Sequence, residues 1–108
     1  MKIASGAGAQ IEVHNVITLG DRGAVLIGYV RAGTARIGQV TPPLVLGDAA
    51  ERRLEVIAVE RLSSMEAGGP PVGLVFRNPP HRDDLRRRLP AGSILVLEEP
   101  GAPAARTV

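Results

Sequence analysis

The chain has 108 residues and no cysteine, so it fits one domain with a modest core and excludes a disulfide framework and cysteine-based metal sites. Thirteen lysines and arginines against eleven acidic residues give a net charge of +2, too small to indicate nucleic-acid binding by itself, and Tyr29 and Phe76 are too few aromatics to stack several bases. The sequence has no apolar run typical of a signal peptide or membrane span, so we expect a soluble, cytoplasmic protein without membrane contact.

The first predicted elements are two strands joined by a tight turn. Ile11–Leu19 and Ala24–Arg31 are rich in β-branched and apolar residues. The Gly20–Gly23 segment between them carries glycine at both ends, a composition typical of turns. We therefore predict a β-hairpin.

Shorter strands are predicted next. Ala35–Val40 and Leu44–Leu46 are short apolar runs on either side of two prolines, which cannot donate to a central ladder. Arg53–Leu62 alternates apolar and polar residues, as expected for a strand with one face in the core. The positions in phase are Leu54, Val56, Ala58 and Glu60.

The last third of the chain predicts two strands and one helical turn. Met65–Pro71 is a loop rich in glycine and proline, and it leads into Val72–Asn78, an apolar run that we expect to be buried on both faces. His81–Leu89 carries acidic residues early and arginines late, which complements a helix dipole. Ser93–Glu99 is the closing strand.

Together these elements predict an all-β fold with one short helical turn. We expect a single closed or nearly closed antiparallel barrel of six or seven strands over residues 11–99, because closure removes exposed strand edges. Residues 1–10 and 100–108 are predicted to be flexible segments.

The glycine-rich stretch from Gly20 to Gln39 does not predict a phosphate-binding loop. Such a loop needs G-x-x-x-x-G-K-[ST] between a strand and a helix, and this sequence has no such motif. Gly28, Gly33 and Gly38 lie within or between predicted strands, which indicates bulges, barrel corners and turns.

Several motifs occur in the order found in domain II of the translational GTPases, the elongation factor Tu-like barrel. The stretch "VHNVITLGDRGAVLIGYVRAGTARIGQ" resembles that family's opening hairpin, with its R-G-T-V-V-T-G-R-V core. The later "AGGPPVGLVFRN" resembles its A-G-x-x-V-G-L-x-L-R-G segment, and "RDDLRRRLPAGSILV" resembles its final turn and strand. The resemblance covers about residues 13–98 and implies the domain II barrel. The first stretch matches at Arg22, Gly23, Val25, Gly28, Val30, Gly33, Ile37 and Gly38.

The sequence also departs from the family at functional positions. Tyr29 stands where the family has arginine, and Pro71 where it commonly has asparagine. In the family this barrel follows a GTPase domain, and in the elongation factors it helps to hold the aminoacyl end of tRNA, whereas this sequence has no nucleotide-binding motif. The resemblance therefore implies a noncatalytic stand-alone binding module that contacts RNA or a translation protein. The alternative is a structural or regulatory protein-interaction adaptor unrelated to translation.

Arginines are the candidate binding residues. A basic patch on the predicted helix would contact phosphates with salt-dependent, sequence-independent affinity, although a solvated face partly neutralised by Asp83 and Asp84 explains the same residues. The resemblance adds two arginines at family positions, which could equally pair with nearby acids. The six candidates are Arg22, Arg77, Arg82, Arg86, Arg87 and Arg88.

No residue set predicts catalysis, a metal site or a cofactor. His14 and His81 are far apart in the sequence and lack the spacing of metal ligands. Asp83 and Asp84 are adjacent on a helical turn, where i,i+4 pairing with Arg87 and Arg88 explains them better than acid–base work. We predict that the protein is not an enzyme, and the sequence leaves its oligomeric state open.

Overall fold

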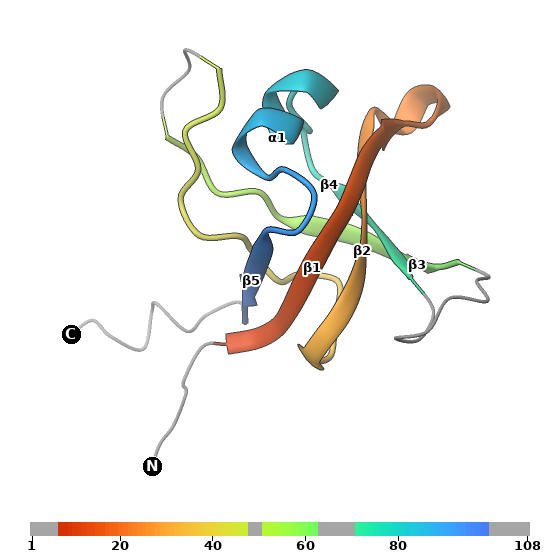
Figure 1. Ribbon diagram of the computed structural model, residues 1–108, viewed down its shortest axis with the longest axis vertical. Coiled ribbons are helices and arrows are strands. Elements are labelled where there is room, and N and C mark those ends of the chain that lie inside the picture. Colours follow the sequence, from red (N-terminus) through yellow and green to blue (C-terminus); the bar gives the residue numbers. More distant parts are fainter. Residues whose placement is uncertain (1–6, 48–50, 63–70, 100–108) are drawn as a thin grey trace.

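The protein is built around one antiparallel sheet, with a short helix, α1, at one end (Figure 1). The computed structural model describes residues 7–47, 51–62 and 71–99. The five strands lie in the order β3-β4-β2-β1-β5, which confirms the prediction of a mostly β fold with one helical turn. The elements are β1 (Ala7–Thr18), the 3-10 turn η1 (Gly20–Arg22), β2 (Ala24–Gly33), β3 (Val56–Arg61), β4 (Val72–Phe76), α1 (Arg82–Arg88) and β5 (Ile94–Glu98).

The predicted hairpin is confirmed and is longer than expected. β1 and β2 pair from Ala9 opposite Gly33 to Thr18 opposite Ala24. The predicted start of the first strand at Ile11 is wrong, because β1 begins at Ala7. The early residues are small and have little strand propensity of their own, but they pair with β2 on one side and with β5 on the other, so tertiary pairing extends the strand.

Two β-bulges interrupt the hairpin close to each other. His14 is the extra residue on β1, between the pairs Val13–Gly28 and Asn15–Ile27. On β2 the extra residue is Arg31. Bulges bend a strand and change the direction of its side chains. Residues 28–30 of β2 lie between the position opposite the first bulge and the second bulge.

Gly28 shows why this hairpin needs a glycine. A Cβ atom at this position would lie 2.6 Å from the carbonyl oxygen of Glu12 and 2.7 Å from the Cγ2 atom of Ile11. The prediction that the glycines of this stretch serve bulges and turns is confirmed here and at Gly33 and Gly38, which both have positive φ angles.

The core fills the inner face of the curved sheet. Buried side chains from every strand, from α1 and from the segments between them form one apolar cluster. β4 is buried along its whole length, as expected, but it ends at Phe76, and Arg77 and Asn78 of the predicted run are exposed. The largest buried side chains of the cluster are Phe76, Ile11, Leu26, Leu44, Leu54, Leu74, Leu85, Leu95 and Leu97.

The alternation predicted for the strand 53–62 holds for only half of its length. Leu54 and Val56 are fully buried as expected. A register irregularity between Val56 and Ala58 then shifts the phase by one residue, so Val59 packs against the core in place of Ala58. The predicted inward positions of Ala58 and Glu60 are therefore wrong, because a one-residue slip exchanges the two faces.

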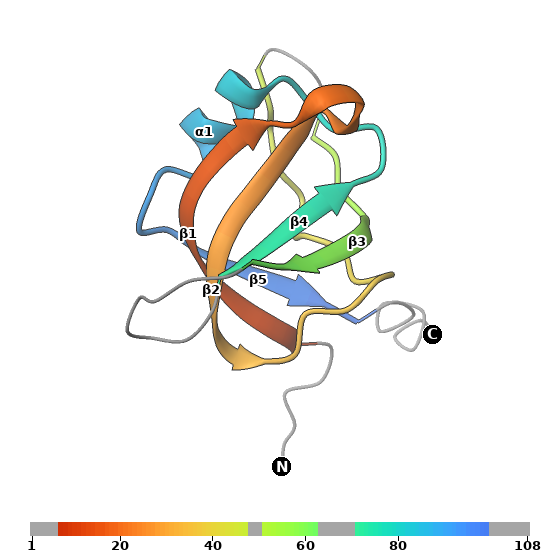
Figure 2. The same ribbon diagram turned by 90° about the vertical axis from the view of Figure 1, so that its right-hand side faces the viewer.

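The segments 35–40 and 44–46, predicted as strands, are not strands. They make isolated bridges, from Val40 to both Glu55 and Glu98 and from Leu44 to Arg52. The hydrogen-bonded sheet therefore has five strands and two edges, β3 and β5, and is not closed on itself. Figure 2 shows how strongly it curls, with β5 crossing behind the long strands β1 and β2. The loop predicted at 65–71 lies outside the described residues except for Pro71.

The helix forms where the sequence predicted it. The Nδ1 atom of His81 accepts a hydrogen bond of 3.0 Å from the backbone N–H of Asp83 and caps the first turn. Leu85 and Leu89 face the core. The guanidinium of Arg86 donates to the carbonyl oxygen of Val16 at 2.8 Å, which ties α1 to the end of β1.

Candidate binding surfaces

The two candidate arginines at family positions are both engaged in ion pairs. Arg22, in the hairpin turn, pairs with Glu60 on β3. Arg77, just after β4, pairs with Glu55 across a distance of 3.0 Å. Both pairs are largely solvent-exposed, so each contributes little to stability. The structure therefore places these two residues beside carboxylates.

Other arginines outside the helix follow the same pattern. Arg31 pairs with Glu12, Arg36 with Glu99 and Arg53 with Glu98. These pairs join residues far apart in the sequence, which is why sequence reasoning did not find them. Together they neutralise much of the charge along the strands and their connections.

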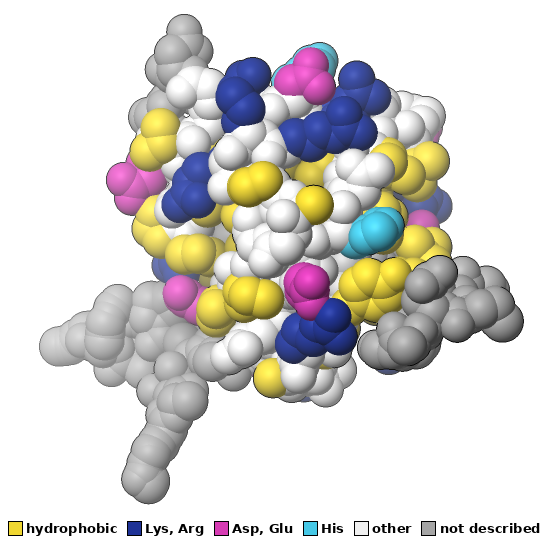
Figure 3. Space-filling model, in the orientation of Figure 1, with side chains coloured by type: hydrophobic (Ala, Val, Ile, Leu, Met, Phe, Trp, Pro, Cys, Tyr) yellow, Lys and Arg dark blue, Asp and Glu magenta, His cyan; other side chains and the backbone are white. Residues whose placement is uncertain are grey.

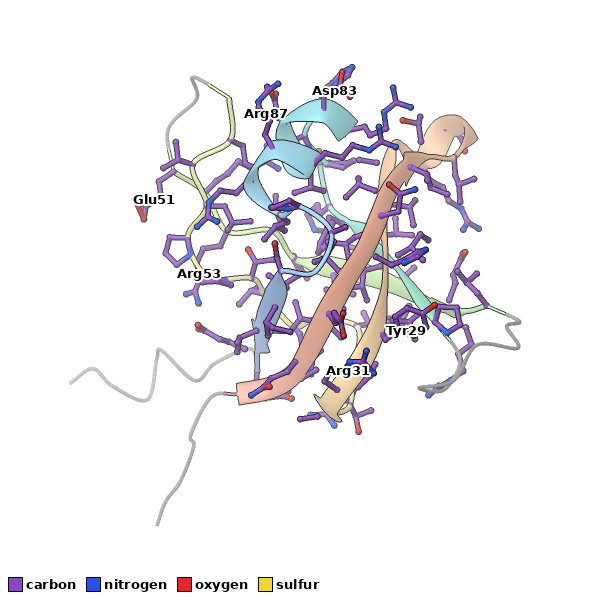
Figure 4. The ribbon with its side chains drawn as sticks, viewed as in Figure 1. Tyr29, Arg31, Glu51, Arg53, Asp83 and Arg87 are labelled. Atoms are coloured by element: carbon purple, nitrogen blue, oxygen red, sulfur yellow. The ribbon has the colours of Figure 1, made fainter. Side chains whose placement is uncertain are left out.

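The charges on α1 are arranged differently. Arg87 pairs with Asp84, three residues earlier, and Arg82 approaches Asp83 at 3.4 Å. The predicted i,i+4 pairs of Asp83 with Arg87 and of Asp84 with Arg88 are wrong, because each aspartate meets a nearer arginine. Figure 4 shows Asp83 and Arg87 on the outer side of α1, at the top of the view.

Two helical arginines have no carboxylate partner within the described part of the chain. The Arg86 side chain donates to a backbone carbonyl, and Arg88 is exposed on the last turn. Arg52 approaches the same end of the molecule, since its guanidinium donates to the carbonyl of Asn78 just before the helix. Figure 3 shows dark blue side chains gathered over this end. We call this the α1 arginine surface, made of Arg52, Arg82, Arg86, Arg87 and Arg88.

A second cluster lies on the outer face of the β1–β2 hairpin. The ring of Tyr29 meets the edge of His14, with the ring centroids 5.8 Å apart, and the Arg31 guanidinium lies 5.6 Å from the Tyr29 centroid. Glu12 accepts a hydrogen bond of 2.6 Å from the Nε atom of Arg31. Figure 4 labels Tyr29 and Arg31 on this face. The two bulged residues meet at this tyrosine, and bulge positions could not be inferred from periodicity.

A small hollow opens at the opposite end of the sheet from α1. Its volume is about 130 Å³, and it lies between the ends of β2 and β3 and the start of β4. Its walls combine apolar side chains with polar surface in about equal measure, and Arg61 is the charged residue among them. None of the predicted site residues lines it. The lining residues are Val30, Gly33, Thr34, Ala35, Val59, Arg61 and Val72.

Across residues 7–47, 51–62 and 71–99, no group of three or more histidines and carboxylates lies close enough to hold a metal ion. His14 belongs to the hairpin cluster and His81 to the helix cap. In the same ranges no helix has the length and apolarity needed to cross a membrane.

Comparison with known proteins adds no relative. No protein-family profile matches the sequence, and no curated protein matches it significantly.

Proposed function

We propose that this chain is a noncatalytic binding module of the translation-factor domain II type, acting in the cytoplasm on RNA. The ordered motifs of residues 13–98 support this assignment. So do the bridges of Val40, which link β5 to the segment before β3 and bring the curled sheet near to closure. The α1 arginine surface is the part of the domain that would contact the phosphates.

The observation that carries the proposal is the uneven neutralisation of arginines. Outside the helix, arginines such as Arg22 in the hairpin turn and Arg31 on β2 have glutamate partners, so their charge is largely cancelled. On the helix, Arg86 and Arg88 lack carboxylate partners among the described residues. Arg82 and Arg87 form exposed ion pairs with aspartates close to them in the sequence. The contrast therefore rests on Arg86 and Arg88, whose guanidinium groups need not leave a carboxylate before they bind a phosphate oxygen.

The test is retention of RNA from host lysate by the immobilised protein, followed by titration of a fluorescent single-stranded RNA at several salt concentrations. Each phosphate contact to single-stranded RNA contributes about 0.7 to the slope of log K against log salt. Arg88→Gln should therefore lower that slope, and Arg77→Gln is the matched control because its partner Glu55 already neutralises it. Absence of RNA binding, or binding that salt does not weaken, contradicts the proposal.

The adaptor alternative is favoured by the hairpin cluster. Tyrosine and arginine are enriched among residues that dominate protein interfaces, and Tyr29 and Arg31 lie together on an outer face. A nuclease-resistant protein partner whose binding is lost in Tyr29→Ala, without any bound RNA, would replace the RNA proposal by this one.

A further inference from the structure

β3 is an edge strand of the sheet, and no neighbouring strand within the described residues uses its outer backbone groups. At its start, Val56 donates its N–H to Gln39 and accepts from Gly38, both at 2.8 Å. Beyond Val56, no other strand of the described chain lies along this edge.

Alternation along β3 shows which groups face outward. Leu62 donates its N–H to the carbonyl of Pro71, on the side of β4. Backbone groups of an antiparallel strand point to alternate sides, so those of Ala58 and Glu60 also face β4. The N–H and C=O groups of Val59 and Arg61 therefore face away from the sheet.

The hollow lies beside the same residues. Val59 and Arg61 both line it, together with apolar side chains of β2, β4 and the segment after β2. A chain added to the edge would place every second side chain toward this hollow, because side chains alternate along a strand. Free backbone donors and acceptors and a pocket for a side chain therefore lie at one place. These are the two components of peptide recognition by strand addition.

We propose that the β3 edge binds an extended segment of a partner protein as an additional strand. The segment inserts an apolar side chain into the hollow and presents a carboxylate to Arg61. This site is separate from the α1 arginine surface, and the inference does not rest on RNA binding.

Charge complementarity selects the acidic partner. Arg61 is exposed and has no carboxylate partner within the residues that the structure describes. A charged side chain on an edge strand normally discourages pairing with another chain. A segment that carries Asp or Glu next to this position converts the repulsive element into an ion pair, whereas neutral or basic segments leave it unmatched.

The experiment is selection of short random peptides, displayed on a surface, by the intact protein. We expect enrichment of sequences with an apolar residue next to or two positions from an Asp or Glu. Arg61→Glu should reverse the preference to Lys or Arg, and Ala35→Leu, which fills the hollow, should abolish enrichment. Arg53→Gln is the control, because it removes an arginine that pairs with Glu98 on β5 and belongs to neither proposed binding surface, so it should leave peptide selection unchanged.

Amide exchange distinguishes strand addition from other modes. An enriched peptide should slow hydrogen exchange at the amides of Val59 and Arg61, since these N–H groups become donors to the added strand. Thermal melting checks that Arg61→Glu and Ala35→Leu are folded. The proposal is overturned by no enrichment, by perturbation confined to other strands, or by protection of these amides through self-association of the chain without peptide.

Discussion

Substitution of Gly28 by alanine tests whether close approach of β1 and β2 requires glycine. The added Cβ would lie 2.6 Å from a backbone oxygen of β1 and 2.7 Å from a methyl group of Ile11, which is fully buried. A backbone atom cannot rotate away, so the hairpin must separate next to the bulge at His14. Such overpacking costs about 1–3 kcal/mol.

Part of this cost is offset in the unfolded state. Replacing glycine by alanine reduces the conformational entropy of the unfolded chain and stabilises the fold by about 0.4–1 kcal/mol. The net loss should be about 1–2 kcal/mol, which corresponds to a decrease in Tm of roughly 4–16 °C for a domain of this size. Thermal unfolding followed by circular dichroism measures it.

Gly73 on the neighbouring strand is the matched control. A Cβ atom there would lie 3.4 Å from Val25 and 3.7 Å from Ile27, which are ordinary contact distances. Gly73→Ala should therefore leave Tm unchanged or raise it slightly. If Gly28→Ala melts at or above the wild-type temperature, steric contact is not the reason for glycine at this position.

Three further substitutions test other features. Gln39 is fully buried, donates to the carbonyl of Thr34 at 2.9 Å and accepts from the N–H of Arg36 at 2.8 Å. Gln39→Ala should lower the free energy of unfolding by about 1–3 kcal/mol and speed hydrogen exchange at the Arg36 amide. Unchanged exchange would show that water replaces the side chain. His81→Ala should cost about 0.5–2 kcal/mol through loss of the helix cap, and the result that contradicts this is an unchanged denaturant midpoint. Glu60→Gln, which breaks the exposed pair with Arg22, should change stability by less than about 1 kcal/mol; a larger loss in chemical denaturation would mean that this pair belongs to a coupled network.

The parts of the fold that the sequence predicted depend on local pattern. The hairpin, β4 and α1 follow from apolar runs, turn glycines and charge placement along the helix. The parts it missed depend on other segments. Val59 turns inward because of a bulge, and β1 starts early because β5 pairs with it. Segment 35–40 pairs with other segments through isolated bridges at Val40. An apolar pattern in the sequence cannot distinguish such a segment from a strand.

The candidate sites show the same limit. Four arginines of α1 were predictable as a group because they are neighbours in the sequence. The glutamate partners of Arg22 and Arg36 lie 38 and 63 residues away in the sequence. Neutralisation of the arginines outside the helix could therefore not be predicted without the structure. The hollow was missed for the same reason, since its walls come from β2, β3, β4 and the segment after β2.

The double bridge at Val40 has a consequence for folding kinetics. Val40 pairs with Glu55 on one side and with Glu98 on the other, so its pairing is complete only when the segment before β3 and the last strand are both in place. Contacts between such distant residues form late because closing long loops costs entropy before any contact offsets it. Until Val40 pairs with Glu98, the β5 edge lacks this neighbour and is exposed to other chains, so refolding should lose yield as protein concentration rises.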